Sequence, residues 1–111
     1  MPEMSEAELQ RSVIELARLY KWKIVHFRGV AVRRKDGSIR YQTPVQGDGA
    51  GFPDLVLVRD KVIFIELKSD RGTLSQEQAL WMEALVKARG VVAYILRPRD
   101  WLDGTIDKIL K

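Results

Sequence analysis

Residues 53–68 read PDLVLVRDKVIFIELK, two apolar runs separated by a short polar segment. The runs at 54–58 and 61–67 have the length and the β-branched content of strands, and residues 59–60 predict a tight turn between them. The second run is apolar without alternation over residues 62–65, which is typical of a strand buried on both faces. We therefore expect an antiparallel pair of strands whose second member lies inside a sheet.

The residues after this pair predict a crossover. Ser75 is a suitable N-cap for a helix that runs to about Arg89 and ends at Gly90. Residues 91–96 form another apolar run, which predicts a second buried strand. Because a helix joins the strands at 61–67 and 91–96, we expect them to be parallel neighbours. A short helix over 100–110 is expected to close the chain.

The residues before the pair predict a helix, a strand and a hairpin. Residues 5–20 have helical apolar spacing, and Ser5 with Glu8 has the pattern of a capping box. Further expectations are a strand over 23–27, a hairpin around Asp36-Gly37 with strands at 30–34 and 39–42, and a loop over the glycine-rich residues 43–51.

Composition agrees with one globular unit. The chain has 111 residues, of which 46% are hydrophobic and 31% charged, and it has no cysteine. No apolar run is long enough to cross a bilayer, and the polar, acidic start does not resemble a signal peptide. We therefore expect an α/β fold, a mixed β-sheet flanked by helices in a single compact domain over 1–111, in a cytoplasmic protein.

Two carboxylates and one ammonium should meet at one end of this sheet. Asp54 begins the first strand and Glu66 lies near the end of the second, and antiparallel strands bring these ends together. Lys68 follows Glu66 by two residues, so strand alternation points it to the same face. Neighbouring carboxylates repel unless a cation lies between them, and Mg²⁺ prefers such hard oxygen ligands. The alternative is three unrelated surface residues at strand ends.

The same residues carry a resemblance to a known family. Pro53-Asp54 and Glu66-Leu67-Lys68 resemble the PD-(D/E)xK nuclease motif, and the chain is similar to a stand-alone VRR-NUC (virus-type replication-repair nuclease) domain. Segments that match in order are Ser5-Glu6, the residues from Gly49 to Asp54, those from Phe64 to Lys68, those from Gly72 to Gln78, and Arg97-Pro98. The resemblance implies a restriction-endonuclease-like fold over nearly the whole chain.

The resemblance also implies roles for the residues at the sheet end. Asp54 and Glu66 would bind a Mg²⁺ or Mn²⁺ ion together with the backbone carbonyl of Leu67. Lys68 would be the catalytic lysine, and Gln78 would lie beside it and help to hold the water or phosphate. The alternative for Gln78 is a solvated position on a helix surface.

The resemblance also implies a carboxylate from the first helix near the metal. Glu6 would lie in an outer shell around the metal, and Glu8 could serve instead. An acidic residue in a first helical turn also complements the helix dipole without any further function.

The net charge of +4 favours a polyanionic partner. Five basic residues crowd the expected hairpin and its approach, and we expect them to bind DNA phosphates; they are Arg28, Arg33, Arg34, Lys35 and Arg40. A solvated sheet edge that discourages strand pairing is the alternative for this segment.

These observations and the resemblance predict a metal-dependent, structure-selective DNA endonuclease for DNA repair. Stand-alone members of the family resemble Holliday-junction resolvases, so we expect a homodimer that hydrolyses phosphodiester bonds of branched DNA. The alternatives are a monomeric nickase or flap nuclease and a catalytically silent nucleic-acid binding module. The resemblance also suggests a viral or prophage origin in a bacterial host cell.

Overall fold

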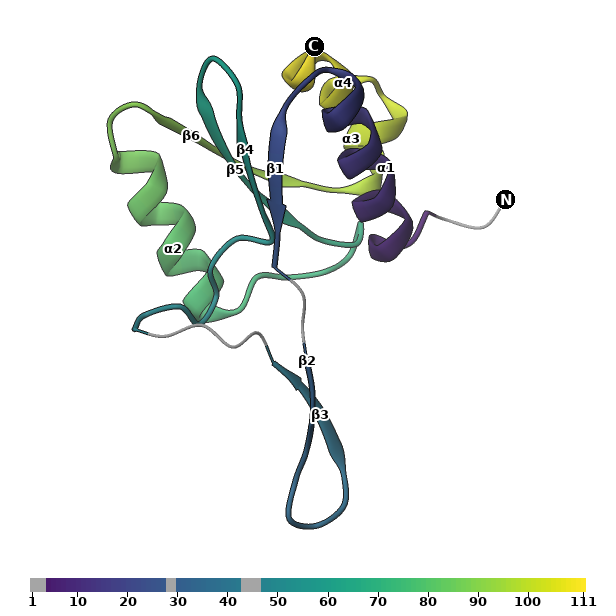
Figure 1. Cartoon of the computed structure of the whole chain (residues 1–111), viewed down its shortest axis with the longest axis vertical. Helices are drawn as coiled ribbons and strands as arrows, with labels where there is room; N and C mark the ends of the chain where they lie inside the picture. Colours follow the sequence, from purple (N-terminus) through teal and green to yellow (C-terminus); the bar gives the residue numbers. More distant parts are fainter. Residues whose placement is uncertain (1–3, 28–29, 43–46) are drawn as a thin grey trace.

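The computed structural model describes residues 4–27, 30–42 and 47–111, arranged as Figure 1 shows. In chain order, the elements in these ranges are α1 (Glu6–Leu19), β1 (Lys23–His26), β2 (Val30–Arg33), β3 (Ile39–Gln42), β4 (Leu55–Val58), β5 (Val62–Leu67), α2 (Gln76–Lys87), β6 (Val91–Leu96), α3 (Pro98–Leu102) and α4 (Thr105–Leu110). Within these ranges, no helix is long and apolar enough to cross a membrane.

Four strands form the main sheet in the order β1-β4-β5-β6. β4 and β5 are antiparallel, with Leu55 opposite Ile65, and the turn between them is closed by the Arg59 N–H, which donates to the Lys61 carbonyl at 3.1 Å. β5 and β6 are parallel, because α2 carries the chain from the end of one strand back to the start of the other. The predicted central strand and crossover are therefore confirmed, and the fold is a mixed sheet flanked by helices.

Helices lie on both sides of this sheet (Figure 1). Alternate side chains of β4 and β5 point to one face, where they join buried residues of α1 and α4 in the hydrophobic core. Leu9, Val13 and Ala17 supply the α1 contribution at intervals of four residues, the spacing of one helical face. On the opposite side of the sheet α2 packs against β6. This arrangement gives the sheet one fully packed face.

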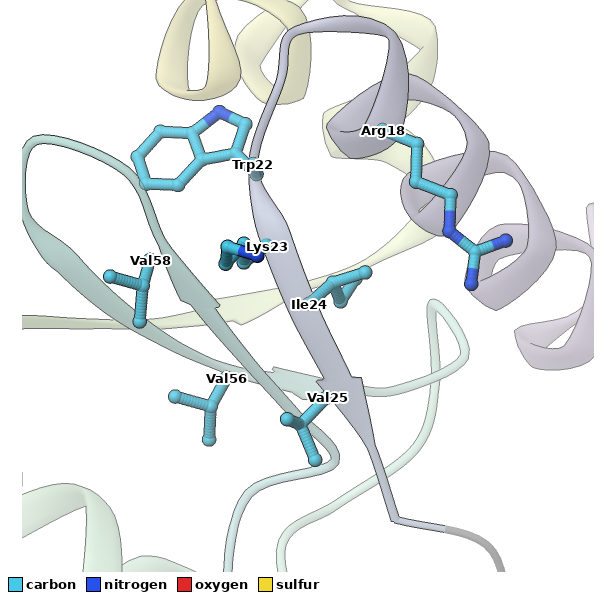
Figure 2. A pocket seen from close by; sticks show the side chains of 7 residues that line it. All are labelled: Arg18, Trp22, Lys23, Ile24, Val25, Val56 and Val58. Carbon is cyan, nitrogen blue, oxygen red and sulfur yellow. The ribbon is translucent and has the colours of Figure 1, made fainter.

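The second face of the sheet is open over β1 and β4. Figure 2 shows Val25, Val56 and Val58 side by side on these strands, with Lys23 of β1 opposite Val58. A hollow of about 480 Å³ is lined by these residues and by Arg18, Trp22 and Ile24. More than half of the Val25 surface is exposed. An apolar strip of sheet therefore faces solvent in the isolated chain.

The predicted hairpin forms a separate two-stranded sheet, β2-β3. Its turn contains Asp36-Gly37, as expected, and an Asp36 carboxylate oxygen accepts from the backbone N–H of Ser38 at 2.9 Å. Figure 1 shows the hairpin projecting from the main body, beyond the end of the sheet where β1 finishes. Two four-residue strands are marginal by themselves in water, and in the described part of the chain neither strand pairs with the main sheet.

Two sequence expectations about the C-terminal third are wrong. The strand at Val91–Leu96 has the expected extent, but of its residues only Leu96 is buried. β6 is an edge strand with a single neighbour, and an apolar run cannot reveal strand order. The expected helix over 100–110 is two helices, separated at Gly104, whose φ of +84° is a left-handed value that ends a helix.

The boundary of α2 also differs slightly from expectation. The helix ends at Lys87, with Ala88 as the C-cap, and not near Arg89. Its predicted start at Ser75 is confirmed.

Candidate metal and nuclease site

Asp54 and Glu66 meet at one end of the main sheet. The pairing of Leu55 with Ile65 places Asp54, the residue before β4, across from Glu66 in β5. One oxygen of the Asp54 carboxylate, Oδ2, accepts from the backbone N–H of Leu67 at 2.9 Å. The antiparallel hairpin thus brings together the carboxylates that are twelve residues apart in sequence, and a backbone bond fixes the first of them.

Glu66 is a buried acidic residue, and only one of its two carboxylate oxygens has a hydrogen-bond partner among the described residues. Its exposed fraction is 1%, and one oxygen, Oε1, accepts from Gln78 Nε2 at 3.1 Å. The other oxygen, Oε2, is buried and has no hydrogen-bond partner among the described residues. A buried polar atom without a partner costs free energy, so this atom is evidently not arranged for the stability of the metal-free chain.

The surroundings of Glu66 raise the pKa of its carboxyl group. Burial, followed by the neighbouring carboxylate of Asp54, raises the pKa of Glu66 from its ordinary value of 4.5 to about 9. The ammonium of Lys68 opposes this change, and the charge of Glu6 adds to it weakly. Asp54, Lys68 and Glu6 therefore all lie close enough to Glu66 to affect its charge.

Lys68 extends the chain just beyond β5, where its backbone N–H donates to the Leu96 carbonyl at 3.1 Å. Alternation along the chain directs Lys68 to the same face as Glu66, and its side chain is half-buried. The predicted grouping of Asp54, Glu66 and Lys68 at one sheet end is thus present in the structure.

Gln78 contacts Glu66 directly from the first turn of α2. Its amide nitrogen makes the bond to Glu66, and its amide oxygen accepts from the N–H of Ser75 at 2.9 Å. Ser75 in turn accepts from the N–H of Gln78 at 3.2 Å, which completes a capping box. The side chain is half-buried, unlike the solvated alternative, and the partner that it touches is a carboxylate.

The two acidic residues at the start of α1 have different interactions. Glu8 closes the capping box of this helix by accepting from the N–H of Ser5 at 3.3 Å. Glu6 is exposed and is the one whose charge acts on Glu66. Of the two, Glu6 is accordingly the better placed for an outer-shell role.

The glycine-rich loop before Pro53 packs against a helix. Gly51 has a φ of +81°, and a Cβ on it would lie 2.5 Å from the carbonyl carbon of Glu77 and 2.6 Å from the backbone nitrogen of Gln78. The next residue, Phe52, packs edge-to-face on Trp81 of α2 with ring centroids 5.0 Å apart. The close approach that requires glycine at this position is that of α2.

A residue whose role the sequence did not indicate is Arg97. One nitrogen of its guanidinium, Nη1, donates to the carbonyls of Ser69 and Gly72, both at 2.7 Å. Arg97 thereby holds the loop that follows Lys68. Its place after the last strand was visible in the sequence, but no local pattern predicts a bond across more than twenty residues.

The residues at the sheet end fit a divalent cation. Mg²⁺ commonly binds through one or two carboxylates and completes its shell with water and phosphate oxygens. Asp54 supplies one carboxylate and Glu66 a second, with an unpartnered oxygen. In the described part of the chain, no group of three or more His, Cys, Asp or Glu side chains is placed to hold a metal, so a closed all-protein cage is not what this site offers.

The structure describes the side chains of three of the five basic residues that we expect to bind DNA. Arg33, Arg34 and Lys35 are exposed at the end of the projecting hairpin. Arg28 lies outside the described residues, and for Arg40 only the backbone, in β3, is described. The arm therefore presents at least three cations at a distance from the core.

Comparison with known proteins identifies the family of the chain. The VRR-NUC domain model matches residues 8–100, most of the chain and all of the central motif. No curated protein and no solved structure gives a match. The matched span contains Asp54, Glu66, Lys68 and Gln78. The chain belongs to the VRR-NUC family of nucleases.

Proposed function

We propose that this nuclease hydrolyses DNA phosphodiester bonds with the help of Mg²⁺ or Mn²⁺ bound at the end of the main sheet. The observation that carries the proposal is Oε2 of Glu66, a buried oxygen without a hydrogen-bond partner among the described residues, beside the carboxylate of Asp54. A cation there would neutralise two repelling groups and satisfy that oxygen.

Asp54 and Glu66 would hold the ion, together with the backbone carbonyl of Leu67, and Glu6 would lie in the outer shell. When bound, the ion supplies charge neutralisation at the phosphate and lowers the pKa of a water molecule. Lys68 would donate hydrogen bonds to the phosphate oxygens as negative charge accumulates on them. Its position next to the carboxylates supports this role.

The hairpin would guide DNA to the site. Arg33, Arg34 and Lys35 are exposed on an arm that extends from the same end of the sheet as Asp54 and Glu66, and phosphate contacts of this kind position a duplex without reading its sequence. Neutralising all three should flatten the slope of log affinity against log salt by about three. An unchanged slope would show that the arm points away from DNA.

We further propose a homodimer that cleaves four-way junctions in paired fashion. The exposed apolar side chains on the open sheet face and on the helices support association, and Val25 and Leu102 are among them, with 53% and 74% of their surfaces exposed. A two-fold pair would place two sites on opposing strands of a junction.

The test compares labelled four-way junction, flap and linear duplex DNA in Mg²⁺, in Mn²⁺ and in a chelator, with light scattering for the mass. We expect metal-dependent, symmetric cuts on opposing strands of the junction by a dimer. Single nicks or trimmed flaps made by a monomer would replace the resolvase proposal with the nickase or flap nuclease. Binding without cleavage of any substrate in either metal would indicate a silent binding module.

A further inference from the structure

Among the described residues, α1 and α2 both begin with a serine capping box, and the residue that completes the box differs between them. α1 begins Ser5-Glu6-Ala7-Glu8 and α2 begins Ser75-Gln76-Glu77-Gln78. In each helix the serine hydroxyl accepts from the N–H three residues later, and the side chain of that later residue accepts from the serine N–H. Glu8 and Gln78 therefore perform the same capping task at the same helical position.

Gln78 makes one bond that Glu8 does not. Its Oε1 serves the cap, and its Nε2 donates to Oε1 of Glu66 at 3.1 Å. A glutamine has one oxygen acceptor and one NH₂ donor group, so the cap determines which end of the amide faces Glu66. A glutamate would cap the helix equally well, but it would place an acceptor where Nε2 donates to Glu66 and would add a negative charge near Asp54.

The bond from Gln78 assigns separate tasks to the two oxygens of Glu66. Oε1 is used within the protein, whereas Oε2 has no partner among the described residues. We propose that Gln78 is a positioning residue, locked by the Ser75 cap, which orients the Glu66 carboxylate so that Oε2 is the atom offered to the cation. The proposal rests on the metal site of the proposed function and assigns to Gln78 a task different from holding the water or phosphate.

Gly51 determines how closely the loop before Pro53 approaches the first turn of α2, which carries Gln78. The space that a Cβ would occupy at Gly51 is filled by the backbone of Glu77 and Gln78, so any larger residue must push the first turn of α2 away from the loop. Because Phe52 packs against both Trp81 of α2 and Phe64 of β5, the loop joins the helix to the strand that carries Glu66. Gly51 is therefore a second positioning residue, acting through the placement of Gln78.

The first test uses thermal denaturation of the metal-free, full-length protein. Gln78→Glu and Glu8→Gln exchange the same two residue types at equivalent capping positions. We expect Glu8→Gln to change Tm little and Gln78→Glu to lower it by several degrees, because a carboxylate replaces the donor to Glu66. The loss should largely disappear when Gln78→Glu is combined with Glu66→Gln, since the exchanged pair can form the same bond with donor and acceptor reversed.

An unchanged Tm for Gln78→Glu would mean that Gln78 only caps the helix, and an equal loss in both backgrounds would mean that residues 66 and 78 do not interact. Either result overturns the proposal. Should Gln78→Glu fail to fold alone, recovery of folding in the combined variant is the expected result, and failure of both overturns it.

The second test measures binding of Mn²⁺ alone by calorimetry. Loss of a residue that orients a metal ligand typically weakens metal binding by about tenfold or more, and we expect this for Gln78→Ala. Ser75→Ala should also weaken Mn²⁺ binding, whereas Ser75→Thr, which keeps the capping hydroxyl, should keep the wild-type affinity. Ser5→Ala, the matched change at the cap of α1, should leave the Mn²⁺ affinity unchanged.

Equal Mn²⁺ affinity in the wild type and Gln78→Ala would overturn the positioning role. Absence of Mn²⁺ binding by the wild type would overturn the metal site itself, and with it the offering of Oε2 to a cation. The denaturation test needs no metal and still reports whether Gln78 holds Glu66.

Discussion

The two ends of β4 carry charged residues in opposite states of pairing. At the far end from the site, Arg59 donates to the carbonyls of Tyr20, Leu110 and Lys111, and its guanidinium lies 4.2 Å from the centre of the Trp22 ring. At the near end, Asp54 lies beside Glu66, whose Oε2 has no partner within the described ranges.

The difference between these two clusters indicates that the one around Arg59 stabilises the fold and that the one around Glu66 serves a ligand. The guanidinium of Arg59 is surrounded by acceptors that close the ends of α1 and α4, so its bonds support folding. At the near end the Glu66 carboxyl group is held away from water beside Asp54, so its ionisation costs stability in the metal-free chain. A carboxyl group that is retained in spite of this cost in stability indicates a ligand. On this view, substitutions at the near end should affect cleavage, whereas substitutions at the far end should affect stability.

The largest expected effect is on cleavage by variants of the near end. Asp54→Ala and Glu66→Ala should each lower the rate constant by about a thousandfold or more, equivalent to roughly 4 kcal/mol, because a single carboxylate holds Mg²⁺ poorly. Single-turnover cleavage of a four-way junction measures the rate, and circular dichroism verifies folding. A folded variant that cleaves at the wild-type rate would remove the residue from the site.

Lys68→Ala should lower the rate constant by about a hundredfold while DNA affinity and Mn²⁺ affinity change little. The reason is that the ammonium is expected to act on charge that develops in the transition state, and not on the bound ground state. Cleavage rates, fluorescence anisotropy and calorimetry separate these quantities. A fall in rate of less than about tenfold, or roughly 1.4 kcal/mol, would contradict the role.

The far end should behave in the opposite way. Arg59→Ala should reduce the free energy of unfolding by about 2 kcal/mol, since several carbonyl oxygens and the Trp22 ring lose their partner. The cleavage rate at a temperature where the variant is folded should equal that of the wild type. If instead cleavage falls while stability is kept, the distinction between the two ends of β4 fails.

A further expected effect is a pH dependence of stability. The pKa of Glu66 in the folded chain, about 9, lies above its ordinary value of 4.5. Between these values the folded state binds more protons than the unfolded state, so the stability associated with Glu66 is complete below pH 4.5 and is lost as pH rises toward 9. Glu66→Gln has no proton to lose, so its metal-free Tm should exceed that of the wild type increasingly toward high pH.

Denaturation of both proteins in chelator, from pH 5 to pH 9, checks this expectation. Parallel curves would mean that Glu66 is ionised in the folded chain throughout the range.

The sequence was sufficient to predict the features that depend on local pattern or on pairing of neighbours. The hairpin of β4 and β5 follows from two apolar runs and a polar turn, and it places Asp54 and Glu66 together by geometry alone. Helix starts at Ser5 and Ser75 were visible because capping depends on residues a few positions apart. The grouping of Asp54 and Glu66 at one sheet end was therefore predictable from the sequence.

Features that depend on distant segments could not be predicted in the same way. The edge position of β6 depends on the order of strands, and the bond from Gln78 to Glu66 depends on how closely α2 approaches the sheet. The approach at Gly51 depends on the same packing. By contrast, the break at Gly104 had a local signal, since glycine after a short helix commonly ends it.

Titration of Mn²⁺ into the metal-free protein, followed by calorimetry, tests the central claim most directly. The account predicts a saturable site in the wild type that is lost in Asp54→Asn and in Glu66→Gln, although both variants keep the shape of the side chain and the fold. Binding of Mn²⁺ with the same affinity and stoichiometry by the wild type and by both folded variants would contradict it, because the two carboxylates would then not be the ligands.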